Sequence, residues 1–88
     1  MKINFTQLKC KPTRKGTEVT MNLAEQVGEV IYQSAATRLD KKLADKVGDS
    51  TGEIELTDDE VKVVKNATKG FLFWAKEAVW GALNIEVE

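Results

Sequence analysis

The sequence predicts a small α+β domain in which an antiparallel sheet packs on two main helices, in the order strand, strand, helix, strand, helix. Three observations on the 88-residue chain predict this class. Short segments alternate apolar and polar residues with a period of two, which is typical of half-buried strands. Two helix-capping sequences each precede a stretch whose apolar residues follow helical spacing. A loop rich in Pro, Gly and charge separates the first two strands.

The N-terminal segment predicts a β-hairpin. Ile3 and Phe5 share one face of the first strand, and Leu8 breaks this alternation, so we expect the strand to end or bulge there. Residues 11–16, KPTRKG, predict the connecting loop, and residues 17–21, TEVTM, predict the returning strand.

The first helix is predicted to begin at Leu23, after an N-x-x-E capping box formed by Asn22 and Glu25. Its apolar stripe shifts by roughly 150° within residues 34–38. Either the helix breaks there, or its second half meets a different surface. Gly48 is expected to end this region as a left-handed cap.

A short third strand, EIEL at residues 53–56, completes the predicted sheet, and TDDE at residues 57–60 forms a second capping box. The last helix is expected to run from Asp58 toward Leu83, with a possible break at Gly70. Acidic residues in the first turn suit the positive end of a helix dipole, so this acidic cluster has a structural explanation.

Aromatic residues are concentrated in residues 70–83, GFLFWAKEAVWGAL. On one continuous helix, Phe73 and Trp80 lie roughly 160–180° from the core-facing residues, next to Lys76. Two aligned large rings predict a patch that another surface covers. That cover is either the first helix or the tail of the same chain, or a second molecule, in the simplest case in a symmetric dimer.

Charge is distributed unevenly along the chain. Residues 1–15 contain only basic charges and residues 53–60 only acidic ones. One explanation places Lys2 and Lys9 opposite Glu53 and Glu55 on adjacent strands. The other is a basic hairpin loop that contacts nucleic-acid phosphates through Lys9, Lys11, Arg14 and Lys15.

Composition argues against catalysis and cofactors. The chain has no histidine and a single cysteine, Cys10, so internal disulfides, a zinc site and histidine-dependent nucleophilic catalysis are excluded. We therefore expect no enzyme activity, no metal, no cofactor and no small-molecule substrate. A signal peptide and a membrane span are also not predicted, so we expect a cytoplasmic protein without membrane contact.

Length and composition predict one domain over residues 1–88, with residues 85–88 as a tail that frays. The segment GEIELTDDEVKVVKNATKG, residues 52–70, and the layout of the chain resemble small accessory proteins of bacteriophages and prophages. The resemblance implies a structural or accessory role exerted through contacts with other proteins, and it carries over no catalytic residue.

These observations lead to two functional hypotheses. The first is a non-enzymatic protein–protein interaction module that self-associates, with Phe73, Trp80 and Lys76 at the contact. The alternative is a nucleic-acid-binding accessory protein that uses the basic residues between positions 9 and 15.

Overall fold

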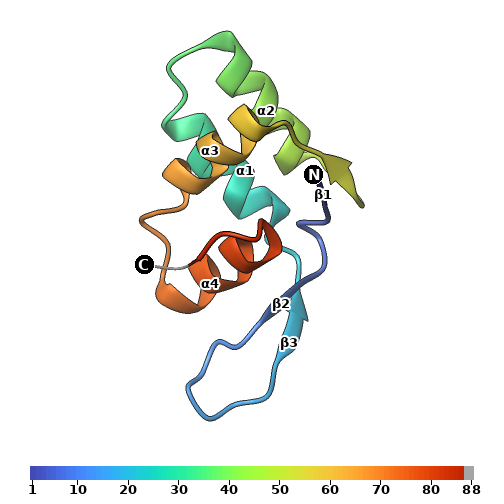
Figure 1. Ribbon diagram of the computed structural model, residues 1–88, viewed down its shortest axis with the longest axis vertical. Coiled ribbons are helices and arrows are strands. Elements are labelled where there is room, and N and C mark those ends of the chain that lie inside the picture. The colour runs from blue at the N-terminus through green and yellow to red at the C-terminus, as the bar shows by residue number, and fades with distance from the viewer. Residues whose placement is uncertain (87–88) are drawn as a thin grey trace.

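The computed structural model describes residues 1–86 and has the predicted α+β class, with two small antiparallel sheets and four helices (Figure 1). In chain order the elements are β1 (Lys2–Ile3), β2 (Leu8–Cys10), β3 (Val19–Met21), α1 (Ala24–Gln33), α2 (Arg38–Gly48), β4 (Ile54–Glu55), α3 (Asp58–Ala67) and α4 (Phe73–Ala82).

The strands form two separate pairs, so the prediction of one sheet with three strands is wrong. β1 pairs with β4, which places Lys2 opposite Glu55, as predicted. The hairpin is formed by β2 and β3, and Lys9 faces Thr20 rather than an acidic residue. A turn divides the N-terminal segment: the Gln7 amide donates to the carbonyl of Asn4 at 3.4 Å. This turn redirects the chain between β1 and β2, which explains why the alternation breaks before Leu8.

The first predicted helix is broken, which confirms one of the two alternatives. α1 ends at Gln33 and α2 begins at Arg38. At the end of α1 the hydroxyl of Ser34 donates to the carbonyl of Val30 at 2.9 Å. At the start of α2 the hydroxyl of Thr37 accepts from the amide of Asp40 at 3.2 Å. Each helix end therefore has its own capping bonds, and the two halves are free to turn different faces to the core.

The start of α1 differs in detail from the prediction. The side-chain oxygen of Asn22 accepts from the amide of Ala24 at 3.0 Å. The expected reciprocal bond from Glu25, which is exposed, does not form. A single Asn bond is sufficient here because Leu23 is already held: its amide donates to the carbonyl of Phe5 at 2.9 Å.

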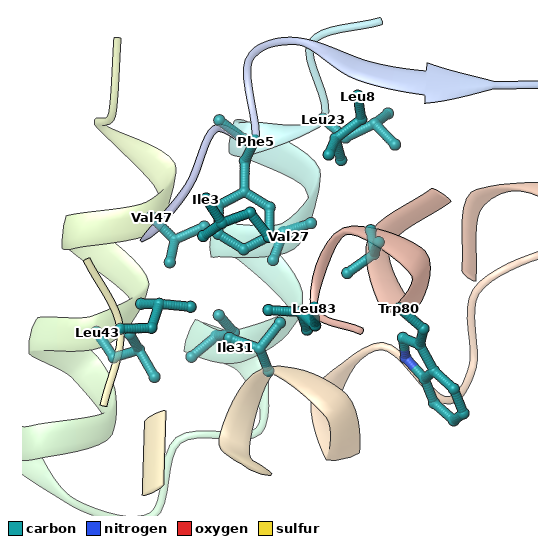
Figure 2. Packing of buried hydrophobic residues seen from close by; sticks show 14 of the residues in the cluster. Ile3, Phe5, Leu8, Leu23, Val27, Ile31, Leu43, Val47, Trp80 and Leu83 are labelled. Atoms are coloured by element: carbon teal, nitrogen blue, oxygen red, sulfur yellow. The ribbon is translucent and has the colours of Figure 1, made fainter. Parts of the chain in front are cut away.

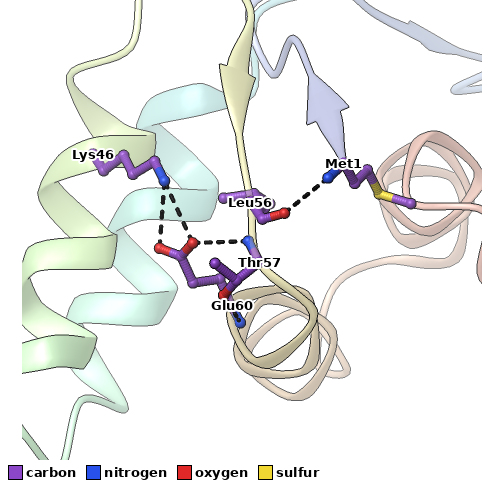
Figure 3. A network of polar contacts seen from close by, with 5 residues as sticks. All are labelled: Met1, Lys46, Leu56, Thr57 and Glu60. Atoms are coloured by element: carbon purple, nitrogen blue, oxygen red, sulfur yellow. Dashed lines mark hydrogen bonds and ion pairs between the residues drawn. The ribbon is translucent and has the colours of Figure 1, made fainter.

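The predicted capping box of α3 is confirmed, and it links three segments (Figure 3). The hydroxyl of Thr57 accepts from the amide of Glu60 at 3.2 Å, and the Glu60 carboxylate accepts from the amide of Thr57 at 2.9 Å. The ammonium of Lys46 on α2 lies 3.4 Å from the same carboxylate. The bond from the Thr57 amide, assisted by Lys46, lowers the pKa of Glu60 below its ordinary value.

α1 and α2 approach each other closely at two glycines. A Cβ on Gly28 would lie 2.5 Å from the Cα of Gly48 and 2.9 Å from the carbonyl oxygen of Ala44, so only glycine fits at position 28. Gly48 is the last residue of α2 and no glycine has a positive φ, so the prediction of Gly48 as a left-handed cap is wrong. The close approach of the two helix backbones depends on Gly28, because a Cβ on Gly48 would make only an ordinary contact of 3.6 Å with the Cα of Gly28.

The hydrophobic core lies between α1 and α2, the N-terminal strands and the end of α4 (Figure 2). Phe5, Val27 and Ile31 are fully buried, and Leu83 joins them from the residue that follows α4. Asn84 then adopts a left-handed conformation with φ 58°, and the amide of Ile85 donates to the carbonyl of Trp80 at 2.8 Å. This helix-ending motif packs Ile85 against the core. Ile85, the first residue of the predicted tail, is thus held by this motif, and residues 87–88 of that tail lie outside the described residues.

The glycine contact predicts opposite effects for two alanine substitutions. Gly28→Ala forces the helix backbones apart, and we expect a loss of about 1–3 kcal/mol in the free energy of unfolding, the range for overpacked cores. Gly48→Ala is the matched control, because its Cβ would meet only the Cα of Gly28 at 3.6 Å. We expect it to be neutral or stabilising by up to about 1 kcal/mol. Urea unfolding of both variants checks this, and equal destabilisation would contradict it.

Candidate interaction surfaces

Trp80 is fully buried within its own chain, so for this ring a cover within the same chain holds, whereas Phe73 stays exposed. The exposed fraction of Trp80 is 0%, whereas that of Phe73 is 61%. The two residues lie two turns apart on α4. Other residues of the chain cover the side chain of Trp80 but leave that of Phe73 exposed. Trp80 is therefore a core residue, and of the two rings only Phe73 is available to a partner.

The cover over Trp80 comes from the end of α3 and from two lysines. The indole nitrogen Nε1 donates to the hydroxyl of Thr68 at 2.8 Å, and this hydroxyl donates to the carbonyl of Val64 at 2.8 Å. The ammonium groups of Lys65 and Lys76 each lie 5.4 Å from the centroid of the indole ring, within the range of cation–π attraction. Lys76, which was predicted to bind a partner, thus helps to cover Trp80.

The assignment of Trp80 to an uncovered side assumed that a break at Gly70 would leave the helical phase argument valid, because Phe73 and Trp80 both follow Gly70. α3 ends at Ala67 and α4 begins at Phe73, which confirms the break expected near Gly70. In the turn between them, the amide of Phe71 donates to the carbonyl of Thr68 at 3.0 Å. The turn brings the end of α3 against α4, so Thr68 and Lys65 of this region contact the indole of Trp80, a cover that the sequence analysis did not name. The N-x-T-K-G ending of the helix, residues 66–70, was the available signal, but it does not give the direction of the turn.

An exposed apolar corner remains at the start of α4. Leu72 and Phe73 are adjacent and expose 70% and 61% of their surfaces. Phe71, the residue before them, is half-buried and lines a shallow hollow of about 480 Å³ together with Val30 of α1. Lys69 is exposed beside this corner. The corner formed by Leu72 and Phe73 therefore combines apolar surface with nearby positive charge.

The predicted basic residues lie on the hairpin, whose β2 strand runs beside α4 and whose loop extends past the helices (Figure 1). All four are exposed, and among the described residues none of them is in an ion pair: Lys9, Lys11, Arg14 and Lys15. The one acidic residue on the hairpin is Glu18. The acidic segment of residues 53–60 pairs with β1 rather than with the hairpin, although Glu53 lines the same cleft as Lys9 and Lys11.

A cleft of about 520 Å³ separates the N-terminal strands from α4. One wall carries Lys9 and Lys11 of the hairpin, and the other carries the half-buried Trp74. The remaining charged lining residues are Lys2, Glu18, Glu53 and Glu77, and the apolar floor includes Ala78, Gly81 and Ala82. Among the described residues, no ion pair joins the lysines and glutamates of this cleft. Sequence reasoning missed Trp74 because it assigned this residue to the flank of the core face.

Cys10 is buried, with an exposed fraction of 1%, and its thiol donates to the carbonyl of Leu8 at 3.5 Å. Burial, together with the nearby carboxylate of Glu18, raises the pKa of the thiol above its ordinary value. A raised pKa lowers the thiolate fraction at neutral pH, so this environment suits a packing role and disfavours reactivity.

Comparison of the chain with protein-family models, with curated proteins and with solved structures finds no match. The resemblance to phage accessory proteins therefore stays a prediction. No helix within residues 1–86 is long and apolar enough to cross a membrane. The same part of the chain contains no group of three or more metal-binding side chains placed to hold a metal ion.

The bond between Trp80 and Thr68 makes the hydroxyl at position 68 important for stability. Thr68→Val keeps the shape of the side chain but leaves the buried indole N–H without an acceptor, and we expect a loss of about 1–3 kcal/mol. Thr68→Ser retains the hydroxyl and serves as the control, with a smaller loss. Thermal unfolding of both variants, followed by tryptophan emission, measures the difference. If valine were tolerated better than serine, the assigned role of the hydroxyl would be wrong.

Proposed function

We propose that the protein is a non-enzymatic interaction module that binds a second copy of itself through the corner formed by Leu72 and Phe73. The observation that carries this proposal is the exposure of two adjacent large apolar side chains at the start of α4. Large exposed apolar groups that adjoin each other are typical of contact sites. A two-fold axis beside the corner would place each pair of side chains against its equivalent in the other copy.

The size of the corner limits the strength of the contact. Covering Leu72 and Phe73 removes on the order of 250 Å² from water, which corresponds to roughly 6 kcal/mol of gross stabilisation at about 25 cal/mol per Å². Association costs of about 4–15 kcal/mol oppose this gain. We therefore expect a weak, concentration-dependent dimer, and the same surface suits a phage-type accessory role in which a larger assembly supplies further contacts.

Substitution of the corner tests self-association. We expect the double variant Leu72→Glu/Phe73→Glu to stay monomeric at protein concentrations where the unmodified chain forms a measurable dimer fraction in sedimentation equilibrium. The matched control is Leu39→Glu on α2, because Leu39 is 76% exposed and lies outside the corner. The control should dimerise like the unmodified chain. A chain that remains monomeric up to millimolar concentration, or a control that loses the dimer equally, would contradict the proposal.

A second candidate function, nucleic-acid binding, is favoured by the position of the basic hairpin. Its four cationic side chains are exposed, lack ion pairs among the described residues and belong to a hairpin that does not pair with the acidic segment. Free cationic groups on a projecting element gain affinity for phosphates by releasing bound counterions. The overall charge of −1 does not prevent this, because the positive charge is concentrated in one place.

A salt titration tests this second candidate. We expect binding to mixed-sequence DNA or RNA at low salt, with an affinity that falls steeply as salt rises, because up to four phosphate contacts are involved. Replacing Lys9, Lys11, Arg14 and Lys15 with Gln should abolish this binding and leave the dimer fraction unchanged. Absence of any binding at low salt would remove this candidate while leaving the self-association proposal intact.

A further inference from the structure

We infer that the cleft between the N-terminal strands and α4 binds single-stranded nucleic acid, with a base stacked on Trp74 and the backbone along Lys9 and Lys11. This inference rests on the second candidate function, and it adds a specific site and a preference for single strands. It concerns a different surface from the corner formed by Leu72 and Phe73.

Trp74 is the first observation that carries the inference. Its side chain is half-buried and lines a cleft of about 520 Å³, within the range of small-ligand sites. Ala78, Gly81 and Ala82 follow on the same side of α4 and line the same cleft. Their small side chains leave space beside the indole that a flat base can fill. Stacking on aromatic side chains is the usual way in which proteins hold unpaired bases.

The charges of the cleft favour one orientation of the strand. Lys9 and Lys11 lie on the hairpin wall and continue along the chain toward Arg14 and Lys15 at the tip. Lys2, Glu18 and Glu53 also line the cleft, so its walls carry both signs of charge. On the hairpin as a whole, the four basic residues from Lys9 to Lys15 outnumber the one acid, Glu18, and a phosphate backbone is therefore attracted to the hairpin side. Glu77 follows Trp74 by one helical turn, and its carboxylate repels phosphate from the α4 side. Because carboxylates accept hydrogen bonds, Glu77 is suited to the donor edge of a stacked base.

A single strand fits this arrangement better than a duplex. Bases in a duplex are already stacked on one another, and a base must leave the stack before it reaches a side chain inside a cleft. An unpaired strand avoids this cost. We therefore expect a twelve-nucleotide thymidine strand, (dT)12, to bind more tightly than a duplex of the same length at the same salt concentration.

Two substitutions at one position separate stacking from charge. Trp74→Phe keeps an aromatic face, whereas Trp74→Leu keeps an apolar side chain without one. At low salt we expect Trp74→Leu to weaken (dT)12 binding by at least about fivefold and Trp74→Phe to weaken it much less, given the usual contribution of base stacking. Inorganic polyphosphate has no bases, so neither substitution should change its affinity. The double variant Lys9→Gln/Lys11→Gln should lower the affinity for both (dT)12 and polyphosphate. The control Lys42→Gln/Lys62→Gln removes two positive charges outside the cleft and should leave both affinities unchanged.

Tryptophan emission provides a readout that does not depend on the leucine variant. In the unmodified chain both tryptophans emit, and (dT)12 should quench the part of the emission that comes from Trp74. With Trp74→Phe, only the buried Trp80 emits, and its emission should not change. Three results would overturn the inference and leave only electrostatic binding by the hairpin. They are an equal loss of (dT)12 affinity in Trp74→Leu and Trp74→Phe, an unchanged Trp74 emission on binding, and tighter binding of the duplex than of the single strand. If neither (dT)12 nor polyphosphate binds at low salt, nucleic-acid binding itself fails.

Discussion

The hydrogen bond from the indole of Trp80 to the hydroxyl of Thr68 holds the C-terminal half of the molecule together. It joins the residue that ends α3 to the last turns of α4, and both groups are fully buried. The same part of α4 continues into Leu83, which packs in the core with Ile31. Trp80 therefore links α4 to the end of α3, and Leu83 after the same end of α4 joins the core that contains Ile31 of α1.

Burial of Trp80 decides which surface of α4 remains available. A small chain has a thin core, and a fully buried indole contributes a large share of its apolar area. The indole of Trp80 lies between Lys65 of α3 and Lys76 of α4. The large apolar side chains that stay exposed in this region are therefore Leu72 and Phe73. Trp74 points to a different side and lines the cleft toward the N-terminal strands. One helix thus presents three aromatic residues to three different environments.

The division of the strands into two pairs has a similar effect on charge. β1 and β4 bring Lys2 beside the acidic segment, whereas the hairpin of β2 and β3, which does not pair with that segment, carries the other basic residues of positions 1–15 (Figure 1). The close contact of Gly28 with Gly48 fixes α1 against α2, and Lys46 of α2 reaches the capping box of α3. These contacts connect the helices to one another, and β2 joins the same core through Leu8 and Cys10 while the loop of the hairpin extends beyond it (Figure 1).

The sequence by itself determined the features that depend on neighbouring residues. Alternation placed Ile3 and Phe5 in the core, the TDDE segment specified the capping box of α3, and the phase shift and Gly70 marked both helix breaks. These signals act within one or two turns of chain, so they are readable without the fold. Only the tertiary structure decided how the broken pieces pack. The helical spacing of apolar residues cannot show that a turn at residues 68–72 brings Thr68 to Trp80. Alternation with a period of two identifies a strand but not the strand with which it pairs. Both outcomes depend on contacts between residues distant in the sequence.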